Sequence, residues 1–308
     1  MKLLRATALA ADVVALMTLV LGSWTRISGA GLTCPDWPLC RGRLIPSLTD
    51  GTIWEWAHRL LAFSVAPLLV ALIVVGWTRR RRSPFIAPLL GGIVALFLLQ
   101  VFLGAETVRL ANTPMSVVLH WATAMALIAA LSAMVAFAST RDGGTAHGGA
   151  QRSNVPTFVV AATAALAFVT MCVGAYVSSS GAGLACLSIP GCAGNVVVYT
   201  PGQVVQMVHR AAAGVTLVGA ATAIAVAWAY PCSLRLRLAA GLGGALVCVQ
   251  IVLGLLNVTL HLPMELREAH AINAALVFLA FFLATLFAAL DTNAALTMRH
   301  IGESGLPS

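Results

Sequence analysis

The stretch SGAGLTCPDWPLC, residues 28–40, recurs as SGAGLACLSIPGC at residues 180–192, 152 positions later. Other pairs repeat at nearly the same separation: AHR ending at Arg59 with VHR ending at Arg210, QVFLG (100–104) with QIVLG (250–254), and His120 with His270. Repetition at a fixed spacing indicates one structural unit that occurs twice in the chain. The fold must therefore be built from two related halves.

The composition is that of a membrane protein. Of the 308 residues, 60% are hydrophobic and 9% are charged, whereas soluble proteins carry about 25% charged residues. The apolar segments are long and continuous, which predicts transmembrane helices and not the alternating strands of a barrel. Eight helices are expected, four in each repeat, at 6–23, 55–77, 85–103, 116–138, 156–177, 204–229, 238–256 and 267–289.

The basic residues predict which loops face the cytoplasm. One set of loops and ends holds 11 of the 18 Lys and Arg residues: Lys2, Arg5, Arg79–Arg82, Arg141, Arg152, Arg235, Arg237 and Arg299. The positive-inside rule then places both termini in the cytoplasm and the long loops 24–54 and 178–203 outside. This asymmetry accounts for the net charge of +8, so no nucleic-acid partner is predicted. Because the first apolar run is long enough to span, no cleaved signal peptide is expected.

These features predict an all-α integral membrane protein of two parallel-repeat four-helix bundles. An even number of helices per repeat brings the second copy into the membrane in the same orientation as the first. The expected parts are a first bundle (1–140), a polar cytoplasmic linker (141–154), a second bundle (155–290) and a cytoplasmic tail (291–308).

Four of the seven cysteines form two matched pairs. Cys34 and Cys40 are six residues apart in the first outward loop, as are Cys186 and Cys192 in the second. An oxidising exterior favours a disulfide in each loop, with free thiols or a metal pair as the alternatives. The other three cysteines lie in helices or a cytoplasmic turn and are interpreted as small apolar residues.

Four histidines occupy equivalent places, whereas His147, His261 and His300 fall in loops or the tail. Every second predicted helix has one histidine near its outer end: His58, His120, His209 and His270. The second and fourth helices of an up-down bundle lie diagonally, so each half should bring two imidazoles face to face. That is the ligand set of a bis-histidine haem. An isolated membrane histidine is more often a helix contact, and zinc would need further ligands of the kind that Glu55 could supply in the first half only.

Arginines near these histidines are candidates for binding haem propionates. Arg59 and Arg210 directly follow His58 and His209, and Arg26 lies at the outer end of the first helix. Arginine binds carboxylates in a bidentate manner. Interfacial snorkelling explains any one of the three equally well.

The two repeats differ at one ionisable position. Glu55 precedes His58 by three residues, and Gln206 precedes His209 by three, so each pair shares one helix face. An ionisable group at membrane depth is by default a functional candidate. A carboxylate favoured by the helix dipole is the simpler explanation. The difference predicts that one half is a working site and the other a fixed cofactor site.

The chain resembles the haem A synthase family over its whole length. The resemblance is carried by TRISGAGLTCPDWPLCRG (25–42), by EWAHR (55–59) and by the four histidines in two four-helix halves. It implies a bacterial enzyme of the plasma membrane that oxidises one methyl group of farnesylated haem O to a formyl group, through an alcohol and a gem-diol. The product, haem A, serves cytochrome oxidase. A haem O synthase and the cytochrome oxidase assembly machinery are then the expected partners, beside membrane lipid.

The resemblance also implies roles for individual residues. His209 and His270 would hold a permanent haem b, His58 and His120 would face the substrate haem, and Glu55 would be the essential carboxylate. The Cys34–Cys40 disulfide would shape the outer loop over the substrate half. The second loop lacks the PDW of the first, as expected of diverged repeats.

Two other classes of function are compatible with parts of the pattern. A dihaem electron carrier between quinol and a periplasmic partner would explain the four histidines but not the difference between Glu55 and Gln206. A transporter built from parallel repeats could use Asp12, midway along the first helix, as a coupling site. Asp12 has no acidic counterpart in the fifth helix, so it is also explained as a residue of the bundle interior.

Overall fold

Eight long α-helices make up most of the chain. The computed structural model describes residues 1–140, 153–192, 194 and 198–303. The long helices are α1 (Lys2–Ile27), α2 (Thr52–Arg79), α3 (Ile86–Arg109), α4 (Pro114–Thr140), α5 (Val155–Ser179), α6 (Pro201–Ala229), α7 (Leu234–Thr259) and α8 (Met264–Glu303). Two short 3-10 helices, η1 (Arg80–Arg82) and η2 (Ala182–Leu184), lie in loops. All eight are long and apolar enough to cross a membrane, so the predicted all-α fold with eight spans is confirmed.

The helices extend beyond the predicted apolar runs. Helix α1 begins at Lys2 and ends at Ile27, and α8 continues to Glu303, well past its expected end at 289. The extensions include charged and polar residues, such as Lys2 and Arg5 of α1 and Asp291 and Asn293 of α8, and a hydropathy pattern does not register these. The expected tail is therefore helical over 291–303. Residues 141–152 of the predicted linker and 304–308 of the predicted tail lie outside the described residues.

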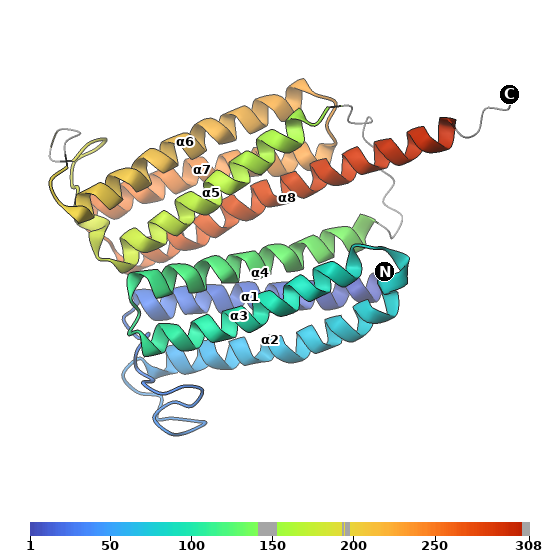
Figure 1. Cartoon of the computed structure of the whole chain (residues 1–308). Coiled ribbons are helices and arrows are strands. Elements are labelled where there is room, and N and C mark those ends of the chain that lie inside the picture. The colour runs from blue at the N-terminus through green and yellow to red at the C-terminus, as the bar shows by residue number, and fades with distance from the viewer. Residues whose placement is uncertain (141–152, 193, 195–197, 304–308) are drawn as a thin grey trace.

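The helices form two groups of four (Figure 1). Helices α2 and α4 both pack against α1, and α6 and α8 both pack against α5. The two histidine-bearing helices of each group, α2 and α4 or α6 and α8, therefore share a neighbouring helix, α1 or α5. The groups meet mainly where α4 contacts α5, with further contacts between α8 and both α1 and α4. Small buried residues such as Ala8 and Ala11 of α1 and Ala284 of α8 allow this close helix packing.

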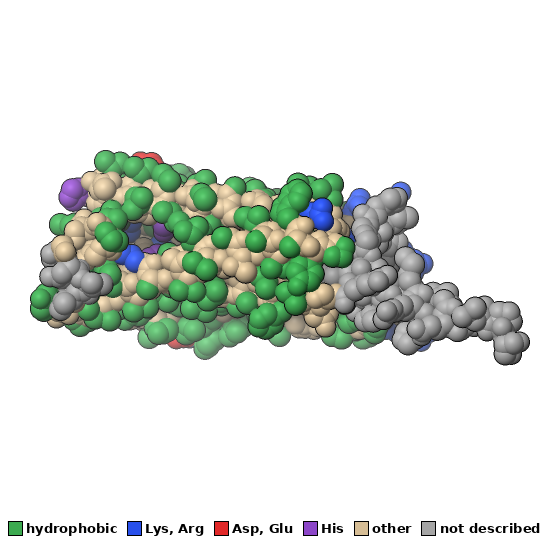
Figure 2. All heavy atoms as spheres, turned by 90° about the horizontal axis from the view of Figure 1, so that it is seen from above, with side chains coloured by type: hydrophobic (Ala, Val, Ile, Leu, Met, Phe, Trp, Pro, Cys, Tyr) green, Lys and Arg blue, Asp and Glu red, His purple; other side chains and the backbone are tan. Residues whose placement is uncertain are grey.

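The two ends of the bundle are different. The loops that join α1 to α2 and α5 to α6 lie at one end, and the start of α1 and the end of α8 lie at the other (Figure 1). Many large apolar side chains are exposed, such as Phe63, Val70 and Phe158. Figure 2 shows apolar side chains along the whole length of one side of the bundle. Such a surface suits contact with lipid chains. Figure 2 also shows histidine and Lys or Arg side chains inside an opening between helices, near the end that carries the long loops.

Candidate functional site

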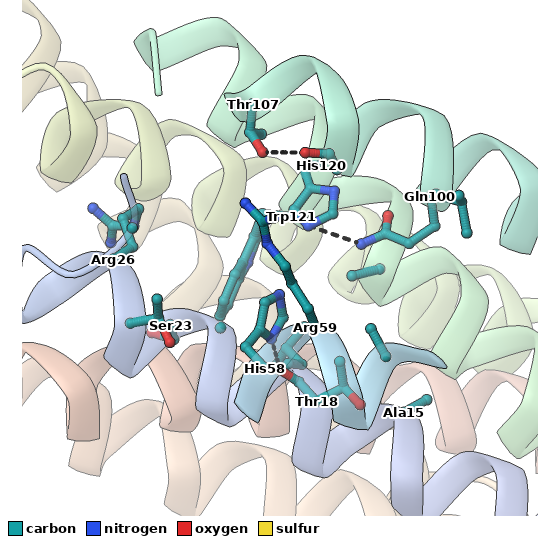
Figure 3. A pocket seen from close by; sticks show the side chains of 18 of the residues that line it. Ala15, Thr18, Ser23, Arg26, His58, Arg59, Gln100, Thr107, His120 and Trp121 are labelled. Atoms are coloured by element: carbon teal, nitrogen blue, oxygen red, sulfur yellow. Dashed lines mark hydrogen bonds between the residues drawn. The ribbon is translucent and has the colours of Figure 1, made fainter. Parts of the chain in front are cut away.

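Each half contains one cavity near the end that carries the long loops. The first, of about 230 Å³, is lined by α1–α4 and includes Glu55, His58 and His120. The second, of about 560 Å³, is lined mainly by α5–α8, with residues of α1 and α4, and includes His209 and His270. The structure thus brings together both histidine pairs that the sequence predicts. Figure 3 shows His58 and His120 pointing into the first cavity from α2 and α4.

The histidine pair of the second half has the spacing that one metal ion would need. The ring centroids of His209 and His270 lie 6.4 Å apart, with the ring planes at 72°. Two imidazole–metal bonds of about 2.0–2.1 Å, added to the distance from each nitrogen to its ring centre, separate the centroids by about 6 Å. A pair of imidazoles at this spacing matches the ligand set of a bis-histidine haem.

The imidazole nitrogens are placed as ligands would be. His58 Nδ1 lies 3.1 Å from the carbonyl oxygen of Thr18, which would orient Nε2 as the free ligand atom (Figure 3). His209 faces the backbone of Thr170 in the same way, and His120 and His270 face the backbone of Gln100 and Gln250.

The two halves treat the second histidine of each pair differently. In the first half, Gln100 Nε2 lies 3.3 Å from His120 Nε2 (Figure 3). In the second half, the matching Gln250 donates instead to the backbone carbonyl of His270, at 3.0 Å. Asn273 donates to the Gln250 side-chain oxygen at 2.7 Å and so fixes this orientation. An amide therefore contacts the imidazole of His120, whereas the imidazole of His270 is left clear of it.

Four glycines make room for the four histidines, and the sequence analysis missed them. A Cβ at Gly22 would lie 2.6 Å from the His58 ring, and one at Gly174 would lie 2.7 Å from the His209 ring. The matching distances are 3.1 Å from Gly104 to His120 and 3.3 Å from Gly254 to His270. Each imidazole thus packs on a helix surface that bears no side chain. The repeat was the available signal, because Gly22 and Gly174 are 152 residues apart and Gly104 and Gly254 are 150 apart.

Glu55 lines the first cavity and also holds the first long loop. Its Oε2 accepts hydrogen bonds from the Thr33 hydroxyl at 3.0 Å and from the Cys34 backbone N–H at 2.9 Å. Its Oε1 pairs with Arg59 at 2.6 Å. Gln206 makes the equivalent contact in the second half, where its Oε1 accepts from the Cys186 N–H. The anchoring of the loop therefore needs an acceptor oxygen but not a charge.

Arg59 and Arg210 are directed at the loops. Arg59 donates to the carbonyl oxygens of Cys34, Asp36 and Leu39. Arg210 donates in the same way to carbonyls of the second loop, those of Cys186, Ser188, Pro190 and Gly191. Both residues line their cavities as well, and their predicted contacts with propionates stay predictions.

Asp36 explains part of the difference between the two loops. Its carboxylate accepts the backbone N–H groups of Gly42, at 2.7 Å, and of Arg41. These hydrogen bonds, that of Gly42 foremost, hold the pKa of the Asp36 carboxyl below its usual range. At the same place in the second loop, Ser188 accepts from the N–H of Gly194. The PDW segment thus closes the first loop with a carboxylate where the second uses a hydroxyl.

The cysteine pairs lie where the sequence predicts them. The Cα atoms of Cys34 and Cys40 are 4.6 Å apart, as are those of Cys186 and Cys192, and the sulfur atoms of each pair lie at disulfide distance. Asp12 lies inside the first bundle, where the Ser132 hydroxyl of α4 donates to it at 2.8 Å. This hydrogen bond fits a residue of the bundle interior.

Arg26 is placed between the two cavities. It lines both of them, together with Val117 and Trp121. Its Nη2 donates to the Ser178 hydroxyl of α5 at 3.2 Å. In Figure 3 it lies on the side of the first cavity opposite Gln100. Of the three predicted arginines, it is the one that reaches both sites.

Comparison with known proteins places this arrangement in a family. The family COX15-CtaA, described as cytochrome oxidase assembly protein, matches residues 5–53 and 48–282. The chain is 28% identical to the heme A synthase of Bacillus pumilus, over 96% of this chain and 95% of that protein. It is 27% identical to the heme A synthase of Bacillus licheniformis, over 92% and 95%. It is 30% identical to that of Symbiobacterium thermophilum, over 71% and 73%. With the family match covering nearly all of the eight-helix fold, the chain belongs to the COX15-CtaA family of cytochrome oxidase assembly proteins.

Proposed function

We propose that this protein is a haem A synthase, which oxidises a methyl group of haem O to a formyl group. The observation that carries the proposal is the pair of histidine-lined cavities, one of which has a carboxylate beside its imidazoles. The relatives bear the name heme A synthase and match the chain over most of its length, which supports this enzyme and not the alternative dihaem electron carrier.

The second cavity is proposed to hold a resident haem b. Its imidazoles, His209 and His270, have the separation that a shared iron needs. Asn273 keeps Gln250 away from the His270 ring, and Gln206 leaves the site without a carboxylate. A haem held there by His209 and His270 would supply one-electron transfer. The protein contributes the two ligands, the apolar walls and the glycine surfaces behind them.

The first cavity is proposed to bind haem O as substrate. His120 has a protein partner there in Gln100, so ligation of this imidazole must displace an amide and is reversible at low cost. The apolar sides of the bundle allow a porphyrin with an isoprenoid tail to enter from the bilayer. Direct transfer from a membrane-bound haem O synthase follows, because such a porphyrin would not be released into water.

Glu55 is proposed to accept protons during the oxidation. Oxidation of a methyl group to a formyl group adds one oxygen atom; with water as its source, four protons and four electrons are released. The protons need a base beside the substrate, and the electrons must pass to a one-electron acceptor outside the chain. Glu55 lines the cavity, and the Thr33 hydroxyl that donates to it belongs to the outer loop. Protons can leave through this loop. Arg59 pairs with the other oxygen of the carboxylate, Oε1, and so holds it in place.

The experiment that tests the function is an analysis of the haems that the protein carries. The chain is expressed in a host that makes haem O, and the extracted haems are separated by chromatography and identified by mass. We expect haem b together with haem A or its alcohol precursor. From Glu55→Gln we expect haem b with unconverted haem O, because glutamine already fills the same structural place at position 206.

The matched control is Gln206→Glu, which changes the same group in the half that is not proposed to react. It should leave the production of haem A in place. Normal haem A from Glu55→Gln would contradict the role of Glu55. Two haem b molecules per chain in every variant, with no haem O or haem A, would show an electron carrier instead.

We also propose that the protein lies in the bacterial plasma membrane with both termini in the cytoplasm. The start of α1 and the end of α8 lie at the same end of the bundle, opposite the long loops, which supports this topology. The distribution of basic residues sets its direction.

A further inference from the structure

One charged residue, Arg26, lies in the wall between the two cavities and lines both of them. Arg26, Val117 and Trp121 line both cavities, and among these three Arg26 alone carries a charge. Arg267 of α8 lines the second cavity and is not among the residues of the first. An anion bound in either cavity could therefore contact Arg26, whereas only an anion in the second cavity could contact Arg267.

Arg26 has donors left for a ligand. Its guanidinium has five N–H groups, and within the described chain one hydrogen bond is formed, to Ser178. Arg59 and Arg210 are engaged by loop carbonyls, and Arg59 also by Glu55. Of the three arginines Arg26, Arg59 and Arg210, Arg26 therefore has the most donors left to bind carboxylates.

The surroundings hold Arg26 between the halves. Glu268 is buried and accepts a hydrogen bond from Ser23 of α1, one helical turn before Arg26, at 2.7 Å. Glu268 attracts the Arg26 guanidinium and Arg267 repels it. The guanidinium group thus lies between the two halves, where it lines both cavities.

We infer that Arg26 couples the two sites by binding the carboxylate groups of a porphyrin in either cavity. The inference rests on the proposed function, which places a haem in the second cavity and haem O in the first. A positive charge beside the second cavity favours the reduced state of its haem, which is the less positive one. Carboxylates that engage Arg26 from the first cavity cancel part of that charge, so the midpoint potential of the resident haem falls.

Thermodynamic linkage makes the effect reciprocal. A porphyrin in the first cavity that lowers the potential of the resident haem must itself bind more tightly when that haem is oxidised. Substrate would therefore load preferentially onto the protein that is ready to accept an electron.

The test uses the purified full chain with its resident haem and a redox-inert probe, zinc protoporphyrin IX, whose binding is followed by fluorescence. Affinity is measured with the resident haem oxidised and then reduced. We expect about tenfold tighter binding to the oxidised protein, which equals a fall in midpoint potential of about 59 mV for a one-electron couple. The dimethyl ester of the probe, which lacks carboxylates, should bind equally to both states.

Variants assign the effect to Arg26. Arg26→Gln should bring the affinity ratio close to one, and Arg26→Lys, which keeps the charge, should restore part of it. Arg267→Gln should lower the potential of the resident haem but preserve the ratio, because Arg267 lines the second cavity alone. Arg109→Gln is the matched control at the same end of the bundle, since Arg109 pairs with Glu106 and lines neither cavity.

The possible outcomes separate this inference from the function on which it rests. An unchanged ratio in Arg26→Gln, or the same ratio with the dimethyl ester, would overturn the coupling and leave the haem sites intact. A purified chain without the spectrum of a bis-histidine haem would contradict the proposed second site and the coupling with it. The same spectrum reports whether each variant has folded.

Discussion

At the scale of single residues, the two halves use the same contacts for different purposes. Glu55 and Gln206 both accept the backbone N–H of the first cysteine in their loop, Cys34 or Cys186. Either glutamate or glutamine can therefore anchor the loop. The negative charge of Glu55 is not needed for this anchoring. Glu55→Gln keeps this loop anchor but removes the ion pair with Arg59, so the bis-histidine spectrum of the resident haem is measured with it as the check of folding.

Gln100 should control how firmly the first cavity holds a porphyrin. Gln100→Leu removes the amide that contacts His120 Nε2, so a haem no longer has to displace a hydrogen bond. Since such a bond contributes about 0.5–1.5 kcal/mol, affinity for haem O should rise about twofold to twelvefold. The measurement is a haem titration of the purified protein. Gln250→Leu is the control, and a similar rise there would contradict the argument.

Arg59 should be more important for stability than Arg210. Arg59→Ala leaves the buried Glu55 carboxylate without its cation and removes the donor to three loop carbonyls. Breaking a buried ion pair in this way costs about 3–5 kcal/mol. Thermal denaturation in detergent should show a clearly lower midpoint for Arg59→Ala than for Arg210→Ala, in which no carboxylate is left unpaired. An equal fall in the denaturation midpoint of both variants would show that the contacts with loop carbonyls, and not the ion pair, determine the loss of stability.

At the scale of helices, the histidines are positioned by the neighbouring helix as much as by their own. Each imidazole rests against a glycine on α1, α3, α5 or α7. Glycine within a helix lowers its stability by roughly 1 kcal/mol relative to alanine, so a repeated glycine needs a packing reason. Here the reason is the space for a ring that must face into the cavity.

Adding one methyl group at these glycines should displace the imidazoles. Gly174→Ala places a Cβ 2.7 Å from the His209 ring, so the ring or the helix must shift. The cost is about 1–3 kcal/mol, and the bis-histidine spectrum should weaken. Gly254→Ala, at 3.3 Å from His270, should have a smaller effect. Gly241→Ala is the control, because nothing lies within 4 Å of a Cβ there, and it should keep the full spectrum.

The sequence predicted the elements better than it predicted their contacts. Long apolar runs and a repeat identify eight helices and place His58, His120, His209 and His270 at one depth. They do not give the rotation of each helix about its axis. For that reason the sequence did not predict that Arg59 and Arg210 donate to loop carbonyls, and their contacts with propionates stay predictions. The contact between Ser23 and Glu268 could not be predicted at all, because it joins different halves and has no repeated counterpart.

At the scale of the whole molecule, the loop end of the bundle should be the oxidising side. Both cysteine pairs lie in loops at that end, whereas Cys172, Cys232 and Cys248 are free in the helices and in the turn that precedes α7. Alkylation in denaturant without reductant should therefore label three of the seven cysteines, and prior reduction should raise this to seven. Mass spectrometry measures the count. Seven labelled cysteines without reductant would contradict the disulfides.

The contact between Arg26 and Ser178 has a consequence for how such a chain can arise. The two positions are 152 residues apart, the spacing of the loop repeat, so they correspond in the two halves and touch one another. In a homodimer of identical four-helix subunits, this residue would face its own copy. Two guanidinium groups at hydrogen-bond distance repel each other, and two serines would leave the seam without a cation. A dimer of identical subunits cannot keep an arginine on one side and a hydroxyl on the other, so this contact requires two halves of different sequence, which a single chain with two repeats supplies.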